Sequence, residues 1–206
     1  VNVTYAGNLP INNAAVKIQE IMGGLYYEAN TADGLATLEC TFGKYRAKVY
    51  VEGIKLNETS VELFQNRNVS IYCKYYGLNV SVRVVDYFGQ SIPNVNVTLK
   101  REGLPQYSGL TGSNGVATFN NIIGGKENTQ ITVYLAGQTQ PCAVRTSLVD
   151  ESKTIEVRIE KYVVLAGFFV KTSYLATVII ILATVILILL IEIYRTRRVK
   201  KLKGSS

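Results

Sequence analysis

Five asparagines in the pattern Asn-x-Ser/Thr are the main residues of this 206-residue sequence whose spacing indicates a chemical modification. The pattern occurs at Asn2, Asn57, Asn68, Asn79 and Asn96. Such an asparagine accepts an N-linked glycan when it lies on the outer surface of a secreted protein. Strand alternation places Asn2, Asn79 and Asn96 on outward faces. The pattern therefore favours a glycosylated region outside the cell.

Three cysteines, Cys40, Cys73 and Cys142, are the next candidates. Cys40 and Cys73 each continue a run of alternating apolar residues that faces inward. They could form a disulfide, which would persist outside the cell, or they could pack as two separate thiols. Cys142 is left over, and we expect a buried free thiol there, with an intermolecular bridge as the less favoured alternative.

Residues for catalysis are nearly absent. The sequence contains no histidine, the commonest general base and metal ligand. It also lacks a glycine-rich phosphate loop, a Cys-x-x-Cys pair and a nucleophile elbow. Asp33, Asp86 and Asp150 are far apart and lie beside expected turns, which indicates solvated turn residues rather than calcium ligands. We expect no catalytic, cofactor-binding or metal-binding residue, and thus no enzyme, in this chain.

An internal repeat organises the first 160 residues. Three pairs of blocks match in the same order: DGLATL with NGVATF (residues 33–38 and 114–119), PINNAAVKI with SIPNVNVTL (10–18 and 91–99), and KVYVEG with TVYLAG (48–53 and 132–137). The first two pairs are 81 positions apart and the third is 84 apart. Matching blocks in one order indicate a tandem duplication.

Each copy reads as a series of short strands. Apolar residues alternate with polar ones, and Asp33-Gly34 or Asn114-Gly115 marks a tight turn. The inward-facing sets are Ala14, Val16 and Ile18, Ala36 and Leu38, Val49 and Val51, and Val69, Ile71 and Cys73 in the first copy, and Val95, Val97 and Leu99, Ala117 and Phe119, Val133 and Leu135, and Ile155, Val157 and Ile159 in the second. About seven strands in roughly 80 residues predict a β-sandwich for each copy.

The order (P)I-x-x-A/V-x-V-x-I/L, then D/N-G-x-A-x-L/F, then V-x-V/L resembles the carboxypeptidase regulatory-like and collagen-adhesin B-type families. Their modules are prealbumin-like, Ig-like, seven-stranded sandwiches. The resemblance covers both copies and implies tandem sandwiches outside the cell, but it implies no reaction. Some adhesin modules carry a Lys–Asn crosslink, and no residues in this sequence identify one.

An apolar segment follows the repeats. Residues 172–191 contain no charge, and 20 helical residues span about 30 Å of hydrocarbon. Tyr174 and Tyr194 bracket the segment at positions suited to the membrane interfaces. Six cations follow: Arg195, Arg197, Arg198, Lys200, Lys201 and Lys203. They predict a single transmembrane helix with the N-terminus outside and the C-terminus in the cytoplasm.

The net charge of +7 comes mainly from this basic tail. Before the apolar segment the chain has 16 basic and 14 acidic residues, so it offers no basic surface for nucleic acid. Within the segment, LATV occurs twice, seven residues apart. The repeat places Ala176, Thr177, Ala183 and Thr184 on one stripe, where small residues could pack against a second helix. The alternative is a helix that serves as an anchor only.

We expect a first sandwich over residues 1–77, a second over 78–161, a neck over 162–171, a transmembrane helix over 172–194 and a basic cytoplasmic tail over 195–206. The predicted function is that of a membrane-anchored extracellular structural or interaction protein, such as a surface stalk or cell-envelope anchor. Its layout resembles an archaeal surface-layer anchoring protein, and its partners would be the lipid bilayer and an envelope protein. The alternatives are an accessory subunit of a membrane complex and the anchor end of a larger extracellular hydrolase or binding protein. Val1 lies where the first strand of a copy starts, which fits a removed signal peptide or preceding domains.

Overall fold

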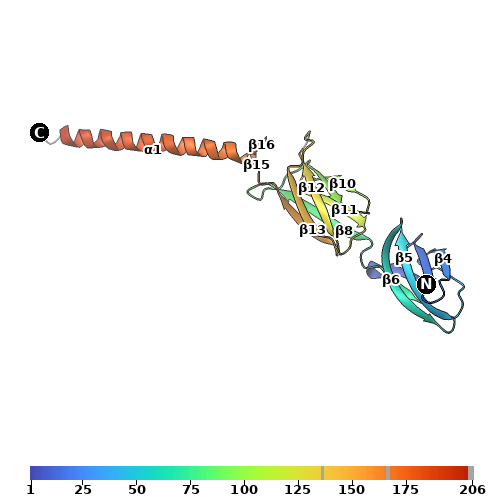
Figure 1. The fold of residues 1–206 in the computed structure, drawn as a ribbon. Helices are drawn as coiled ribbons and strands as arrows, with labels where there is room; N and C mark the ends of the chain where they lie inside the picture. Colours follow the sequence, from blue (N-terminus) through green and yellow to red (C-terminus); the bar gives the residue numbers. More distant parts are fainter. Residues whose placement is uncertain (136, 166–167, 204–206) are drawn as a thin grey trace.

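A computed structural model describes residues 1–135, 137–165 and 168–203, with residues 196–203 by their backbone alone. Figure 1 shows two β-sandwiches in succession, followed by a short hairpin and a long helix that points away from them. The predicted class, an all-β region of two sandwiches followed by one C-terminal helix, is confirmed.

The first sandwich has two layers. Its strands are β1 (Asn2–Tyr5), β2 (Leu9–Pro10), β3 (Ala15–Glu20), β4 (Tyr26–Asn30), β5 (Gly43–Val51), β6 (Ile54–Leu63) and β7 (Ser70–Tyr72). One sheet has the order β2-β1-β7 and the other β4-β3-β5-β6. Between the sheets lie the alternating apolar residues that the sequence placed inward, among them Val16, Val49 and Ile71. The core thus consists of every second residue of these strands, because successive side chains of a strand point to opposite faces.

The second sandwich repeats this architecture. Its strands are β8 (Leu78–Val85), β9 (Asn96–Lys100), β10 (Tyr107–Leu110), β11 (Val116–Ile122), β12 (Asn128–Tyr134), β13 (Ala143–Leu148) and β14 (Lys153–Arg158). The sheets have the orders β11-β8-β14 and β10-β9-β12-β13. Val97, Leu99, Phe119 and Ile155 are buried in its core, as predicted.

The repeated Asx-Gly turn places a glycine against the first strand of each copy. The Val3 N–H donates to the Gly34 carbonyl at 2.7 Å, and the Val84 N–H donates to the Gly115 carbonyl at 2.8 Å. The two glycines have φ of +76° and +72°, and a Cβ on either one would lie within 3.0 Å of backbone atoms. Only glycine adopts a positive φ easily and also has no Cβ to collide with the neighbouring backbone. This explains why the Asx-Gly turn is so similar in the two copies.

One predicted strand is wrong. Residues 36–42 of the first copy form no strand, whereas the equivalent residues of the second copy form β11. Leu38 and Cys40, expected in the core, are half-buried. The reason is pairing: β11 is hydrogen-bonded to residues 78–83 of β8, whereas in the described part of the chain no strand pairs with residues 37–41.

The two sandwiches are in direct contact. The Tyr5 and Tyr76 rings meet edge to face with centroids 5.1 Å apart. The Gly124 N–H donates to the Tyr75 carbonyl at 2.8 Å, and Ile123 of the second sandwich packs into the core of the first. The boundary that we propose between residues 77 and 78 coincides with the start of β8.

The neck is a β-hairpin, a structure that the sequence did not predict. Strand β15 (Tyr162–Leu165) pairs with β16 (Phe168–Lys171), and β16 continues directly into helix α1 (Thr172–Lys203). The Thr172 N–H donates to the Lys161 carbonyl at 3.1 Å, so the helix begins beside the end of the second sandwich.

Candidate membrane anchor and interaction surfaces

Helix α1 carries the candidate membrane anchor. Thr172–Arg195, 24 residues, is the one stretch of the described chain that is helical, long and apolar enough to cross a membrane, and none of it is buried against the sandwiches. At 1.5 Å per residue it measures about 36 Å, enough for the hydrocarbon core of a bilayer. No part of the described protein covers this apolar helix, which fits a single-pass membrane anchor.

The predicted helix-packing stripe is exposed along α1. Ala176, Thr177, Ala183 and Thr184 are all exposed. The two hydroxyls donate to the carbonyls of Ser173 and Ile180, one helical turn back, at 2.9 and 2.8 Å. Because both hydroxyls are satisfied within the helix, the stripe offers close approach rather than hydrogen bonds to another helix. That it binds a partner stays a prediction.

The topology signal lies at the end of the helix. Arg195 is exposed, and α1 continues through Lys203. The side chains of Arg197, Arg198, Lys200, Lys201 and Lys203, and residues 204–206, lie outside the described part of the chain. The cytoplasmic placement of the tail stays a prediction.

The neck presents apolar side chains next to the start of the helix. Phe168, Phe169 and Leu165 are exposed on the β15–β16 hairpin. The Lys171 ammonium lies 5.8 Å from the centre of the Tyr174 ring. Aromatic and basic residues together suit the boundary between hydrocarbon and water.

Asp86 connects the second sandwich to the neck. Its side chain is 0% exposed. One carboxylate oxygen accepts the N–H groups of Phe88 and Gln90 at 2.9 and 2.8 Å, and the other accepts the Val164 N–H at 3.0 Å. The expectation of a solvated turn residue is wrong here, because the carboxylate replaces water with three backbone donors.

The five potential glycosylation sites lie on the two sandwiches. Asn57, Asn68, Asn79 and Asn96 are exposed, whereas Asn2 is half-buried because β1 is the middle strand of its sheet. Asn57 donates to the Tyr72 carbonyl at 2.7 Å, a bond that a singly substituted amide nitrogen can keep with its remaining hydrogen. Exposure permits modification, and modification itself stays a prediction.

We expect a glycan on at least two of these asparagines, first on Asn57 and Asn96, because both are exposed on strands. Mass spectrometry of peptides from native membranes, without prior removal of sugars, measures this. The variant Asn96→Gln should lose the modification at that site alone. Unmodified peptides at all five positions would contradict the prediction.

The structure draws no bond between any two of the three cysteines, and whether Cys40 and Cys73 form a disulfide stays a prediction. Cys73 is fully buried, and burial raises the pKa of its thiol to about 11. Burial also raises the pKa of Cys40 and of Cys142, whose sulfur donates to the Val133 carbonyl at 3.1 Å. A thiol with a raised pKa is a weaker nucleophile at neutral pH, and Cys73, fully buried in the core of the first sandwich, packs as a small apolar residue.

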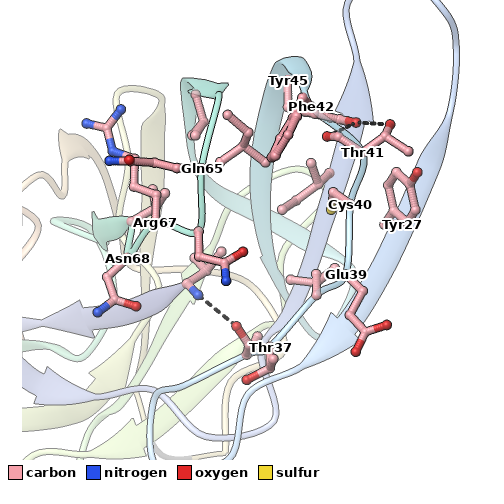
Figure 2. A pocket seen from close by; sticks show the side chains of 18 residues that line it. Tyr27, Thr37, Glu39, Cys40, Thr41, Phe42, Tyr45, Gln65, Arg67 and Asn68 are labelled. Carbon is pink, nitrogen blue, oxygen red and sulfur yellow. Dashed lines mark hydrogen bonds between the residues drawn. The ribbon is translucent and has the colours of Figure 1, made fainter.

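A groove of about 750 Å³ opens along the first sandwich, between residues 36–42 and 65–69. Figure 2 shows Thr37, Glu39 and Cys40 on one side and Arg67 and Asn68 on the other. Core residues, Tyr45 among them, lie beneath it. Among the described residues no group of His, Cys, Asp and Glu could hold a metal ion, and the groove brings together no acid and base of a catalytic type.

Comparison with known proteins supports the fold. Neither a protein-family model nor a curated protein matches this sequence. Among solved structures the chain is similar to GBS52, a minor pilin of the Gram-positive pathogen Streptococcus agalactiae, with a TM-score of 0.50 and 15% identity over 77% of this chain and 93% of that one. A streptococcal ancillary pilin has a TM-score of 0.37 at 15% identity, over 77% and 61% of the two chains. The shaft pilin SpaA of Lactobacillus rhamnosus GG has 0.36 at 8% identity, over 76% and 94%. The likeness to GBS52 concerns the β-sandwich fold, and the carboxypeptidase regulatory-like and archaeal assignments stay predictions.

Proposed function

We propose that this chain is a membrane-anchored structural and interaction protein of the cell surface, without catalysis of its own. The observation that carries the proposal is the uncovered apolar helix Thr172–Arg195 at the end of two sandwiches in series. Such a layout holds protein-binding surfaces at a distance from a bilayer. A fold similar to that of a minor pilin supports a structural or adhesive role.

The proposal includes an orientation with the sandwiches outside. The basic residues after the apolar helix and the glycosylation patterns before it support this orientation independently. The lipid bilayer and a protein of the cell envelope are then the partners.

Protease added to intact cells is expected to remove the sandwiches and to spare an epitope attached after residue 206, because the membrane shields the tail. Immunoblots for both ends measure this, with permeabilised cells as the control in which the tail is also lost. Replacing the six tail cations by glutamate should scramble the orientation, since the positive-inside signal is removed. Sandwiches that survive in intact cells and disappear in permeabilised ones would reverse the proposed topology.

A second candidate function is that of an accessory subunit in a larger membrane complex. The exposed stripe with Ala176 and Ala183 favours it, because small residues permit close packing of a neighbouring helix. The anchor end of a larger hydrolase or binding protein is a third alternative. Purification in mild detergent followed by mass spectrometry identifies the partner and separates the first two roles.

A further inference from the structure

The groove in the first sandwich lies where the second sandwich has part of a strand. In the second sandwich, residues 78–81 of β8 lie between β11 and β14: Ser81 and Val80 are opposite Thr118 and Phe119 on one side, and opposite Thr154 and Lys153 on the other. An offset of 81 relates Thr118 and Phe119 to Thr37 and Leu38 of the first sandwich. An offset of 86, which aligns β14 with β7, relates Thr154 and Lys153 to Asn68 and Arg67. All four line the groove.

Both walls of the groove carry peptide groups suited to a strand. In the described chain, none of the backbone N–H groups of residues 37–42 or 65–68 has a backbone acceptor. Unpaired peptide groups at a sheet edge accept an added strand. Apolar side chains also remain half-buried there, Leu38, Leu63 and Val69 among them. In the second sandwich, Leu78 and Val80 of β8 are buried in the core.

The adjoining end of the first sandwich is apolar and uncovered. Phe42 is 71% exposed and Phe64 is 70% exposed, and Met22 lies in the β3–β4 loop at the same end. By the repeat offset of 81, Phe42 corresponds in sequence to Ile123 of the second sandwich. Ile123 is buried, because the first sandwich covers that end of the second. Figure 1 shows the first sandwich at the end of the chain farthest from α1.

We propose that this end of the first sandwich is an interface for a further β-sandwich domain of the same repeat type. That domain covers Phe42 and Phe64 and places an extended strand in the groove, parallel to β7 and in line with β1. The strand has apolar residues at its first and third positions and polar ones at its second and fourth, as in residues 78–81. The pattern fits because only alternate side chains reach the core. The proposal concerns the interface and is independent of the side of the membrane on which it lies.

To test whether the groove binds a strand, the full chain is extended by Leu-Asn-Val-Ser directly ahead of Val1 and is studied in detergent. The matched control carries Asn-Leu-Ser-Val, which has the same composition but turns its apolar side chains to the opposite face. Hydrogen exchange at the amides of residues 37–41 and 66–69 is expected to slow by about 10-fold or more in the first variant and to stay unchanged in the control. Equal exchange in the two variants would show that the groove is not a strand site.

The domain is tested with residues 1–81 repeated ahead of Val1, so that a second copy of the first sandwich precedes the groove. Slowed hydrogen exchange is expected to extend to the amides of residues 22–25 and 42–43. Phe42→Asp should remove this additional slowing and leave the slowed exchange at residues 37–41 unchanged. Protection no wider than that given by the four-residue extension would overturn the domain interface and leave a site for a strand alone.

Discussion

Replacing Leu99 by alanine is expected to lower the free energy of unfolding of the second sandwich by about 2–5 kcal/mol. Leu99 is 1% exposed in the middle of its sheet, opposite Tyr107 on β10 and Ile131 on β12. Alanine would leave a cavity that the close-packed neighbours fill only in part, so both transfer energy and packing are lost.

Denaturant unfolding of the full chain in detergent, followed by circular dichroism, measures this loss. Leu110→Ala is the matched control, because Leu110 is a leucine on the adjacent strand β10 that is 67% exposed. The control should change the free energy by less than about 0.5 kcal/mol. A similarly small change for Leu99→Ala would contradict the strand register, since a slip of one residue reverses the faces of a strand.

The features that could be predicted from the sequence are those that depend on neighbours along the chain. Alternation in Val95, Val97 and Leu99 identifies an inward face, because successive side chains of a strand point in opposite directions. The uncharged run at 172–191 identifies, for a similar reason, a helix that is long and apolar enough to cross a membrane.

Strand pairing was less predictable because it depends on distant residues. Ala36, Leu38 and Cys40 alternate as Ala117 and Phe119 do, yet residues 36–42 form no strand. A strand is stable only beside another strand, and the periodicity of one segment does not say whether its partner is present. The groove was missed for this reason.

A pair of buried threonines was also missed. Thr31 accepts a hydrogen bond from the Ala14 N–H and donates one to the Ile11 carbonyl, at 2.9 and 2.6 Å. Thr111 makes the same two bonds in the second sandwich, at 3.0 and 2.8 Å. The two threonines are 80 positions apart whereas the blocks around them are 81 apart, so the turn differs in length by one residue and hides the correspondence. The available signal was a threonine shortly before each Asx-Gly turn.

Asp86 was misjudged because its partners come from elsewhere in the chain. A carboxylate beside a turn is usually solvated, and nothing near residue 86 indicates that Val164, 78 positions away, donates to it. Because this bond joins the sandwich to the hairpin that precedes α1, Asp86 helps to position the second sandwich relative to that helix.

Asp86→Ala is therefore expected to lower the free energy of unfolding of the second sandwich by about 2–4 kcal/mol, since three backbone donors lose their acceptor. Asp86→Asn should have a smaller effect: the amide oxygen can still accept two N–H groups, while the NH2 group opposes the Val164 N–H. Hydrogen exchange at Val164 should accelerate in both variants, because its acceptor is lost in each.

Asp150→Ala provides the control, since Asp150 also accepts a hydrogen bond, but at the surface, from Lys153 at 2.9 Å. A surface ion pair of this kind contributes about 0–1 kcal/mol, and its removal should leave exchange at Val164 unchanged. Equal effects of Asp86→Ala and Asp150→Ala on unfolding and on Val164 exchange would contradict the role of Asp86. If the effects differ as expected, the hairpin is held to the sandwich by a buried carboxylate, and the anchor and the β-sandwiches move as a connected unit rather than as parts joined by a flexible neck.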